Sequence, residues 1–186
     1  MKHFTAIFFT LQCGLLSAVM AETPKTITIQ TPDGLVTAKT ITVESKPQKI
    51  ETVSAKQRIS IDAAAAKANR FVSDYLPGVS NPSLTDFDDA FSLWQAEARR
   101  RYTEQQVIDI LGAYLGNRLA ADFQMEWILV TDQDGTDYAV RGKKFEVMSF
   151  PYASVAKRIE NKKHEFMSGV YYTVKDAIEK GDFKVR

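Results

Sequence analysis

The hydrophobic pattern of this chain changes its period near residue 126. Upstream of that point, from residue 59 on, apolar residues recur at the three- and four-residue spacing of a helix face. The apolar run at 126–131 is short and continuous, as expected of a buried strand. Helical spacing returns after Pro151. Because the helices and strands are segregated along the chain, the sequence predicts an α+β fold.

The predicted elements follow the order helices, strands, helices. We expect a first helix from Ser60 or Asp62 to about residue 76, a second from Thr85 or Asp86 to the basic run at 99–101, and a third after a capping box at 103–106. Strands are expected at 126–131, 136–140 and 145–150, and helices at 151–162 and 168–180. The three strands should form an antiparallel meander, with helices covering one face of the sheet.

Residues 22–58 differ in composition from the rest and allow two interpretations. Ile27 and Ile29, and then Ile41 and Val43, alternate with threonine, and the segment 32–34 (Pro-Asp-Gly) between them favours a turn. The segment is therefore either an extra hairpin or a flexible leader, because a two-stranded hairpin is marginal on its own. A linker is expected at 46–49, and a single α+β domain over 59–186.

Residues 1–21 have the three parts of a secretory signal peptide. Lys2 supplies the positive charge, residues 6–19 are mostly apolar, and a small or medium residue stands at each key position before the cleavage site. A membrane anchor needs about 20 apolar residues, and a lipoprotein signal needs its cysteine at the end of the run, whereas Cys13 lies inside it. We expect a mature chain that begins at Glu22, is periplasmic or secreted, and does not span a membrane.

Composition narrows the chemistry that such a mature chain can perform. Loss of Cys13 and His3 would leave no cysteine and a single histidine, His164, which excludes disulfides, a cysteine nucleophile and metal sites built on cysteine or paired histidines. The full chain has 24 basic and 23 acidic residues, so it has almost no net charge that would attract nucleic acid electrostatically. His164 lies in a lysine-rich stretch and is interpreted as a surface residue. With no nucleotide-binding or nucleophile motif, we predict no catalytic residue, no metal and no cofactor.

The densest acidic cluster of the chain contains Asp132, Asp134 and Asp137. An EF-hand calcium loop that starts at Asp132 would need a glutamate where Lys143 stands. Aspartate and glycine are the residues expected in a hairpin turn, so we prefer that interpretation. The alternative keeps these three aspartates, with Glu126, as the carboxylates of a hydrolase.

Gly112 and Gly116 lie four residues apart on one face of the third predicted helix. Each glycine destabilises a helix by about 1 kcal/mol, which close packing of this face against the sheet or another helix would offset. Trp127, in the most apolar strand, is expected to pack between that helix and the sheet. Exposed on an aromatic face with Tyr171 and Tyr172, it would instead be a binding residue.

A set of motifs between residues 104 and 165 resembles a bacterial domain family of unknown function, number 3806 of its series. The motifs are the glycine-containing helix, the strand with Trp127, the Asp-x-x-Gly-x-Asp turn at 132–137 and the Phe-Pro helix entry at 150–151. The resemblance implies that this region forms a unit extended by the preceding helices, and it implies no activity and no functional residues.

Two functional hypotheses remain after these exclusions. The first is an exported, non-enzymatic binding or interaction module of the bacterial cell envelope, with an envelope protein as partner and Asp132, Asp134, Asp137 and Trp127 as candidate binding residues. The second is the carboxylate-based hydrolase. We favour the first, because aspartates in turns rarely perform catalysis.

Overall fold

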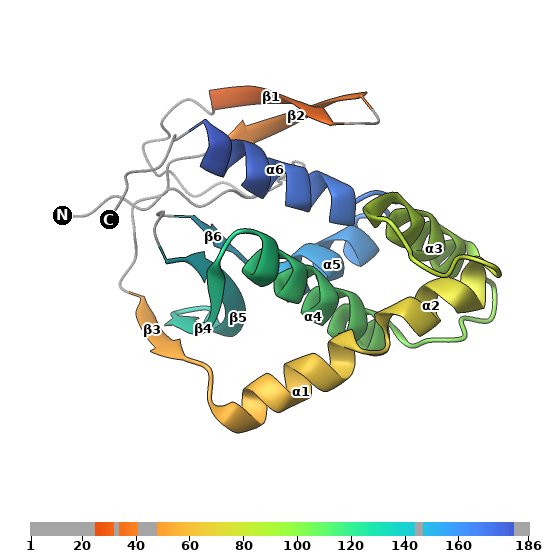
Figure 1. Ribbon diagram of the computed structural model, residues 1–186, viewed down its shortest axis with the longest axis horizontal. Coiled ribbons are helices and arrows are strands. Elements are labelled where there is room, and N and C mark those ends of the chain that lie inside the picture. Colours follow the sequence, from red (N-terminus) through yellow and green to blue (C-terminus); the bar gives the residue numbers. More distant parts are fainter. Residues whose placement is uncertain (1–24, 32–33, 41–47, 144–146, 181–186) are drawn as a thin grey trace.

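The computed structural model describes residues 25–31, 34–40, 48–143 and 147–180 (Figure 1). The strands are β1 (Lys25–Thr31), β2 (Gly34–Thr40), β3 (Lys49–Thr52), β4 (Met125–Asp132), β5 (Gly135–Gly142) and β6 (Met148–Ser149). The helices are α1 (Ala55–Ala65), α2 (Ala68–Tyr75), α3 (Leu84–Ala96), α4 (Glu104–Asp122), α5 (Pro151–Glu160) and α6 (Met167–Glu179). The predicted α+β class is confirmed.

The main sheet has four antiparallel strands in the order β3-β4-β5-β6. The prediction of three strands was short by one, because Lys49–Thr52 lies in the segment expected to be a linker and leader. There it pairs with β4, with Ile50 opposite Val130. A four-residue strand with one aliphatic residue carries too little pattern to be recognised, and only its pairing partner makes it a strand. At the other edge, β6 comprises Met148 and Ser149. Of the strand predicted over 145–150, residues 145 and 146 lie outside the described residues, and Val147 and Phe150 are not part of the strand.

The first predicted helix is two helices, and it begins earlier than expected. Ser54 caps α1 by accepting a hydrogen bond from the backbone N–H of Gln57, whose side chain bonds back to the backbone of Ser54. This capping box lies upstream of Ser60, where the sequence had placed the start. Ile61 is the one buried residue of α1, so its apolar periodicity was a weak guide to its bounds.

The basic run at 99–101 does not belong to a helix. The helix α3 ends at Ala96, and Glu97 already has an extended backbone. By contrast, the capping box predicted for the next helix is confirmed, with Thr103 accepting from the backbone N–H of Gln106 at the start of α4.

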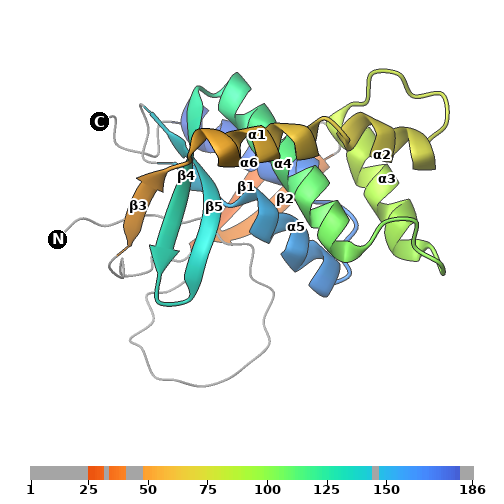
Figure 2. The ribbon, with the colours of Figure 1, turned by 90° about the horizontal axis from the view of Figure 1, so that it is seen from below.

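The core lies between the helices and one face of the sheet, with α4 running through its middle (Figures 1 and 2). Aromatic side chains fill most of the space among the helices. Trp94, Phe71, Phe87, Phe91 and Phe166 are the largest fully buried ones. The opposite face of the sheet carries a smaller buried cluster, in which Ile128, Val130 and Ala139 pack with neighbouring apolar side chains. The strand β4 is therefore central, with buried side chains on both faces of the sheet.

The N-terminal strands β1 and β2 pair with each other as an antiparallel hairpin that lies beside α6 (Figure 1). The second strand of this hairpin is formed by residues 34–40, whereas Ile41 and Val43, on which the predicted strand was based, lie outside the described residues. The expected signal peptide, 1–21, and the expected cleavage site before Glu22 lie outside the described residues. Within the described ranges, no helix combines the length and apolarity that crossing a membrane requires.

Candidate functional site

Trp127 lies inside the core, with 5% of its surface exposed. Its indole Nε1 donates a hydrogen bond of 2.9 Å to Oδ1 of Asn117 on α4, and Nδ2 of Asn117 donates to Oδ1 of Asp62 on α1 at 2.9 Å. The rings of Tyr138 and Tyr152 lie against the indole. With its polar atom satisfied and its ring enclosed, Trp127 joins β4 to two helices and presents almost no surface for a ligand.

The two glycines of α4 make this packing possible. A Cβ atom added to Gly116 would lie 2.1 Å from Cζ2 of Trp127, and one added to Gly112 would lie 2.9 Å from the Cα of Tyr152 on α5. Both distances are shorter than carbon atoms tolerate. The predicted close approach of this helix face to its neighbours is confirmed, with the sheet at Gly116 and α5 at Gly112.

The three aspartates of the acidic cluster lie around the turn between β4 and β5. Oδ1 of Asp132 accepts the backbone N–H of Asp134 at 2.9 Å, which is a local turn contact. Gly135 has a φ of 137°, in the left-handed region that favours glycine. Asp134 and Asp137 are exposed, and nowhere in the described parts of the chain do three or more metal-ligating side chains group together. Turn geometry accounts for Asp132, Asp134 and Gly135, and Asp137 lies on β5 beside the turn.

His164 is exposed in the loop between α5 and α6. Its backbone carbonyl accepts a hydrogen bond from the hydroxyl of Ser92 at 3.3 Å. The loop is thus attached to α3 through its main chain, and the surface placement expected for the imidazole is confirmed.

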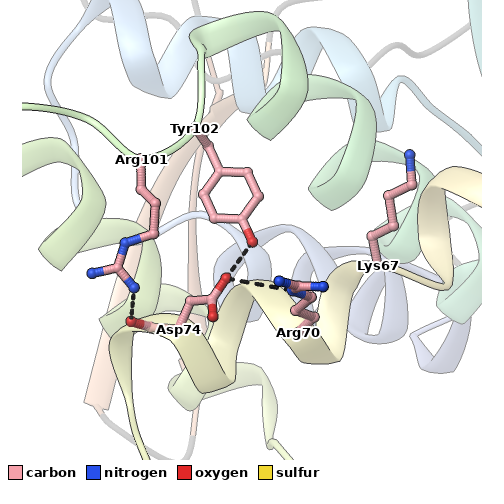
Figure 3. Close-up of a pocket in the computed structure, with 5 residues that line it drawn as sticks. All are labelled: Lys67, Arg70, Asp74, Arg101 and Tyr102. Atoms are coloured by element: carbon pink, nitrogen blue, oxygen red, sulfur yellow. Dashed lines mark hydrogen bonds and ion pairs between the residues drawn. The ribbon is translucent and has the colours of Figure 1, made fainter.

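A surface pocket of about 490 Å³ opens between α2 and the loop that joins α3 to α4 (Figure 3). Lys67, Arg70 and Asp74 line it from α2 and its N-cap, and Arg101 and Tyr102 line it from the loop. Three of these five side chains are basic and one is acidic. The lining therefore offers ammonium and guanidinium donors, which suit an anionic group.

The loop side of the pocket is held rigidly. Nη1 of Arg101 donates a hydrogen bond of 2.6 Å to the backbone carbonyl of Asp74 (Figure 3). The guanidinium of Arg101 lies over the ring of Tyr75, 5.2 Å from its centroid. That carbonyl belongs to the last turn of α2, where a cation is favoured by the helix dipole. The hydroxyl of Tyr102 donates 2.5 Å to Oδ2 of Asp74. Burial and this hydrogen bond raise the pKa of Tyr102, so the phenol stays a donor at neutral pH.

Glu97 connects this loop to α2 through hydrogen bonds. Its Oε2 accepts the hydroxyl of Tyr75 at 2.7 Å and the backbone N–H of Arg101 at 2.9 Å. The backbone hydrogen bond and the Tyr75 hydroxyl lower the pKa of Glu97, and burial, reinforced by Glu97, raises the pKa of Tyr75. Arg101, from the basic run that the sequence placed at the end of the second predicted helix, therefore forms part of a pocket wall instead.

Sequence reasoning missed the pocket because its two walls are separated along the chain. Lys67, Arg70 and Asp74 follow the spacing of one helix face, a signal that could have indicated a charged stripe on α2. Nothing in that stripe indicates that residues 101–102 lie opposite it.

A buried carboxylate was also missed. Asp88 on α3 is 4% exposed, and it accepts hydrogen bonds from the backbone N–H groups of Phe166, Met167 and Ser168 and from the hydroxyl of Ser168. These groups form the N-terminus of α6, whose own N-cap side chain makes no capping bond. Asp88 therefore caps a helix from a distant part of the chain.

These features define an α+β domain with a glycine-based helix contact at its centre and a basic pocket on its surface. The family model named Domain of unknown function (DUF3806) matches residues 89–171. The resemblance indicated by the motifs is confirmed by this match, which extends beyond 104–165 at both ends.

The fold also occurs in a solved structure. A crystal structure from Bacteroides thetaiotaomicron VPI-5482 is similar with a TM-score of 0.53 at 10% sequence identity, covering 82% of this chain and 69% of that one. At this identity the likeness concerns the fold alone. A comparison with curated proteins found no match.

Proposed function

We propose that this protein is an exported, non-enzymatic binding module of the bacterial cell envelope that uses the pocket between α2 and the α3–α4 loop. The observation that carries the proposal is the lining of this pocket, in which Arg101 and Tyr102 are fixed and Lys67 and Arg70 project from a helix. A preformed concave site with convergent polar groups is the usual form of a binding site.

The pocket lining supports binding rather than catalysis. Its members are lysine, arginine, aspartate and tyrosine, and Asp74, the one carboxylate, is engaged by Tyr102. A general base must be free to accept a proton from a substrate. The hydrolase alternative has less support, because Oδ1 of Asp132 accepts the backbone N–H of Asp134 within the turn.

Export rests on the sequence of residues 1–21, with its charged start, apolar run and small residues before Glu22. An envelope location would place the mature chain beside other exported proteins, which are the partners that we propose for it.

Site-specific photo-crosslinking of the full chain in bacteria tests both parts of the proposal. A photoreactive amino acid is placed at Ala66, an exposed position next to the pocket, or at Gln133, an exposed position in the β4–β5 turn. Figure 2 shows that α2 and this turn lie at opposite ends of the molecule. Neither substitution removes a lining residue or an aspartate of the turn.

We expect discrete adducts from position 66 in the periplasmic fraction, few from position 133, and an N-terminus at Glu22 by sequencing. Adducts from position 133 alone, or from neither position, would contradict binding through the pocket. Retention of Met1, or a lipid on Cys13, would contradict export by the proposed route.

A further inference from the structure

We infer that the pocket beside α2 binds an acidic side chain from a segment of a partner protein. This inference rests on the proposed function, and it specifies the chemistry of the ligand. It depends on the charges that remain unmatched in the pocket, on the rigidity of one wall, and on the charge balance of the whole chain.

The basic residues Arg70 of α2 and Lys67 at its N-cap have few partners. The side chain of Arg70 is 82% exposed, and its Nε lies 3.9 Å from Oδ2 of Asp74, at the outer limit of an ion pair. Lys67 makes no ion pair with any described residue. The two residues are three positions apart on one helix, so they lie on the same face and can approach one ligand together.

The nearby carboxylates are already engaged by other groups. Oδ2 of Asp74 accepts the Tyr102 hydroxyl, and Oε2 of Glu97 accepts the Tyr75 hydroxyl and a backbone N–H. Each carboxylate still forms one long ion pair, Asp74 with Arg70 at 3.9 Å and Glu97 with Arg101 at 3.8 Å. An incoming carboxylate would therefore meet N–H donors of Lys67, Arg70 and Arg101 that these long contacts leave available.

Arg101 gives the ligand a preformed surface. Its guanidinium is held by the carbonyl of Asp74, by the ring of Tyr75 and by an ion pair of 3.8 Å between Nη2 and Oε1 of Glu97. A guanidinium has five N–H donors, and this side chain is 52% exposed, so further donors remain for a ligand. A side chain that is already ordered loses little entropy on binding. Only Lys67 and Arg70 need to be ordered by the ligand.

The charge distribution favours a single carboxylate over a membrane or a nucleic acid. The full chain has a net charge of only +1, and Asp74 and Glu97 stand beside the basic residues. A surface of closely spaced phosphates would meet these carboxylates as well as the cations, and the chain has no general field to draw it in. One acidic side chain with its flanking backbone suits a pocket of about 490 Å³.

The test is an NMR titration of the isotope-labelled chain from Glu22 onward with defined probes. The probes are a capped pentapeptide with a central glutamate between alanines, the same peptide with glutamine, inorganic phosphate, and vesicles of phosphatidylglycerol. We expect the glutamate peptide to shift the resonances of Arg70 and Arg101 and to bind about tenfold more tightly than the glutamine peptide. The difference should shrink at high salt, because exposed charges are screened.

Two double variants with equal loss of charge provide the control. Lys67→Gln with Arg70→Gln should weaken glutamate-peptide binding by roughly five- to tenfold, because two exposed ion pairs are lost. Lys56→Gln with Lys175→Gln removes the same charge from α1 and α6 and should leave binding unchanged. Melting curves of both variants check that the fold is retained.

Several outcomes would overturn the inference. These are equal affinity for the two peptides, equal weakening by the two double variants, phosphate binding as tight as that of the glutamate peptide, or capture by the vesicles. If any of these results is obtained together with crosslinks from position 66, the proposal of a binding module is retained and only the proposal of an acidic ligand is rejected. Absence of those crosslinks would reject the proposed function itself.

Discussion

The carboxylate of Asp88 accepts a hydrogen bond of 2.8 Å from the backbone N–H of Met167, the first residue of α6. The same carboxylate binds the N–H groups on either side of Met167, so one side chain of α3 satisfies the free donors of a helix that starts far along the sequence. Arg158, whose pKa is lowered by burial and raised less by Asp88, lies near this carboxylate.

Replacing Asp88 should destabilise the domain strongly. In Asp88→Ala the N–H groups of α6 remain buried without an acceptor, and we expect a loss of about 2–4 kcal/mol in the free energy of unfolding. Asp88→Asn keeps one acceptor oxygen and should lose less. The measurement is urea denaturation followed by circular dichroism. Asp89→Ala, an exposed neighbour on the same helix, is the control, and equal losses at 88 and 89 would contradict the capping role.

A methyl group should have opposite effects at two glycines. In Gly116→Ala the new Cβ meets the indole of Trp127, and we expect a destabilisation of about 1–3 kcal/mol from overpacking. At Gly169 on α6 a Cβ would meet nothing within 4 Å, so Gly169→Ala should stabilise by up to about 1 kcal/mol through helix propensity. The measurement is the melting temperature of each variant compared with that of the wild type. A Gly116→Ala variant as stable as the wild type would show that the helix face is not closely packed in solution.

Truncation of Trp127 should leave the protein unfolded or barely folded. Removal of a buried tryptophan costs about 3–5 kcal/mol, a large part of the ~5–15 kcal/mol that stabilises a typical domain. Trp127→Phe keeps most of the ring volume and loses the hydrogen bond to Asn117, which should cost about 1 kcal/mol or more. If Trp127→Ala melts like the wild type and fails to capture a partner, Trp127 is a binding residue.

The stability of the domain should fall in alkaline solution. Burial is the main cause that raises the pKa of Tyr152 from 10.0 to about 12. The folded protein then keeps a proton that the unfolded chain releases above pH 10. The contribution is complete below pH 10 and is lost as the pH rises through about 12.

Comparison of the wild type with Tyr152→Phe isolates this effect, because the lysine titrations are common to both proteins. The difference in their free energies of unfolding should be constant near pH 8 and should change between pH 10 and 12 in favour of the variant. Absorbance of tyrosinate at alkaline pH follows the ionisation directly. Parallel stability curves over the whole range would mean that Tyr152 ionises in the folded state as easily as in the unfolded one.

The local pattern of the sequence determined the elements that depend on near neighbours. The capping box at Thr103, the turn at Gly135 and the apolar run around Trp127 each express a preference that acts over a few residues. The packing of Gly112 and Gly116 could be predicted as well, because glycine within a helix has a cost that only close approach offsets.

The tertiary structure alone decided the features that depend on distant partners. Thr52 and its neighbours in β3 form a strand because β4 offers them an edge, and Asp88 is a helix cap because α6 begins beside it. The pocket exists because Arg101 reaches the end of α2, where Asp74 presents a carbonyl without a helical partner. Such contacts depend on where the folded chain places its segments, and the residue types in each segment are compatible with many other placements.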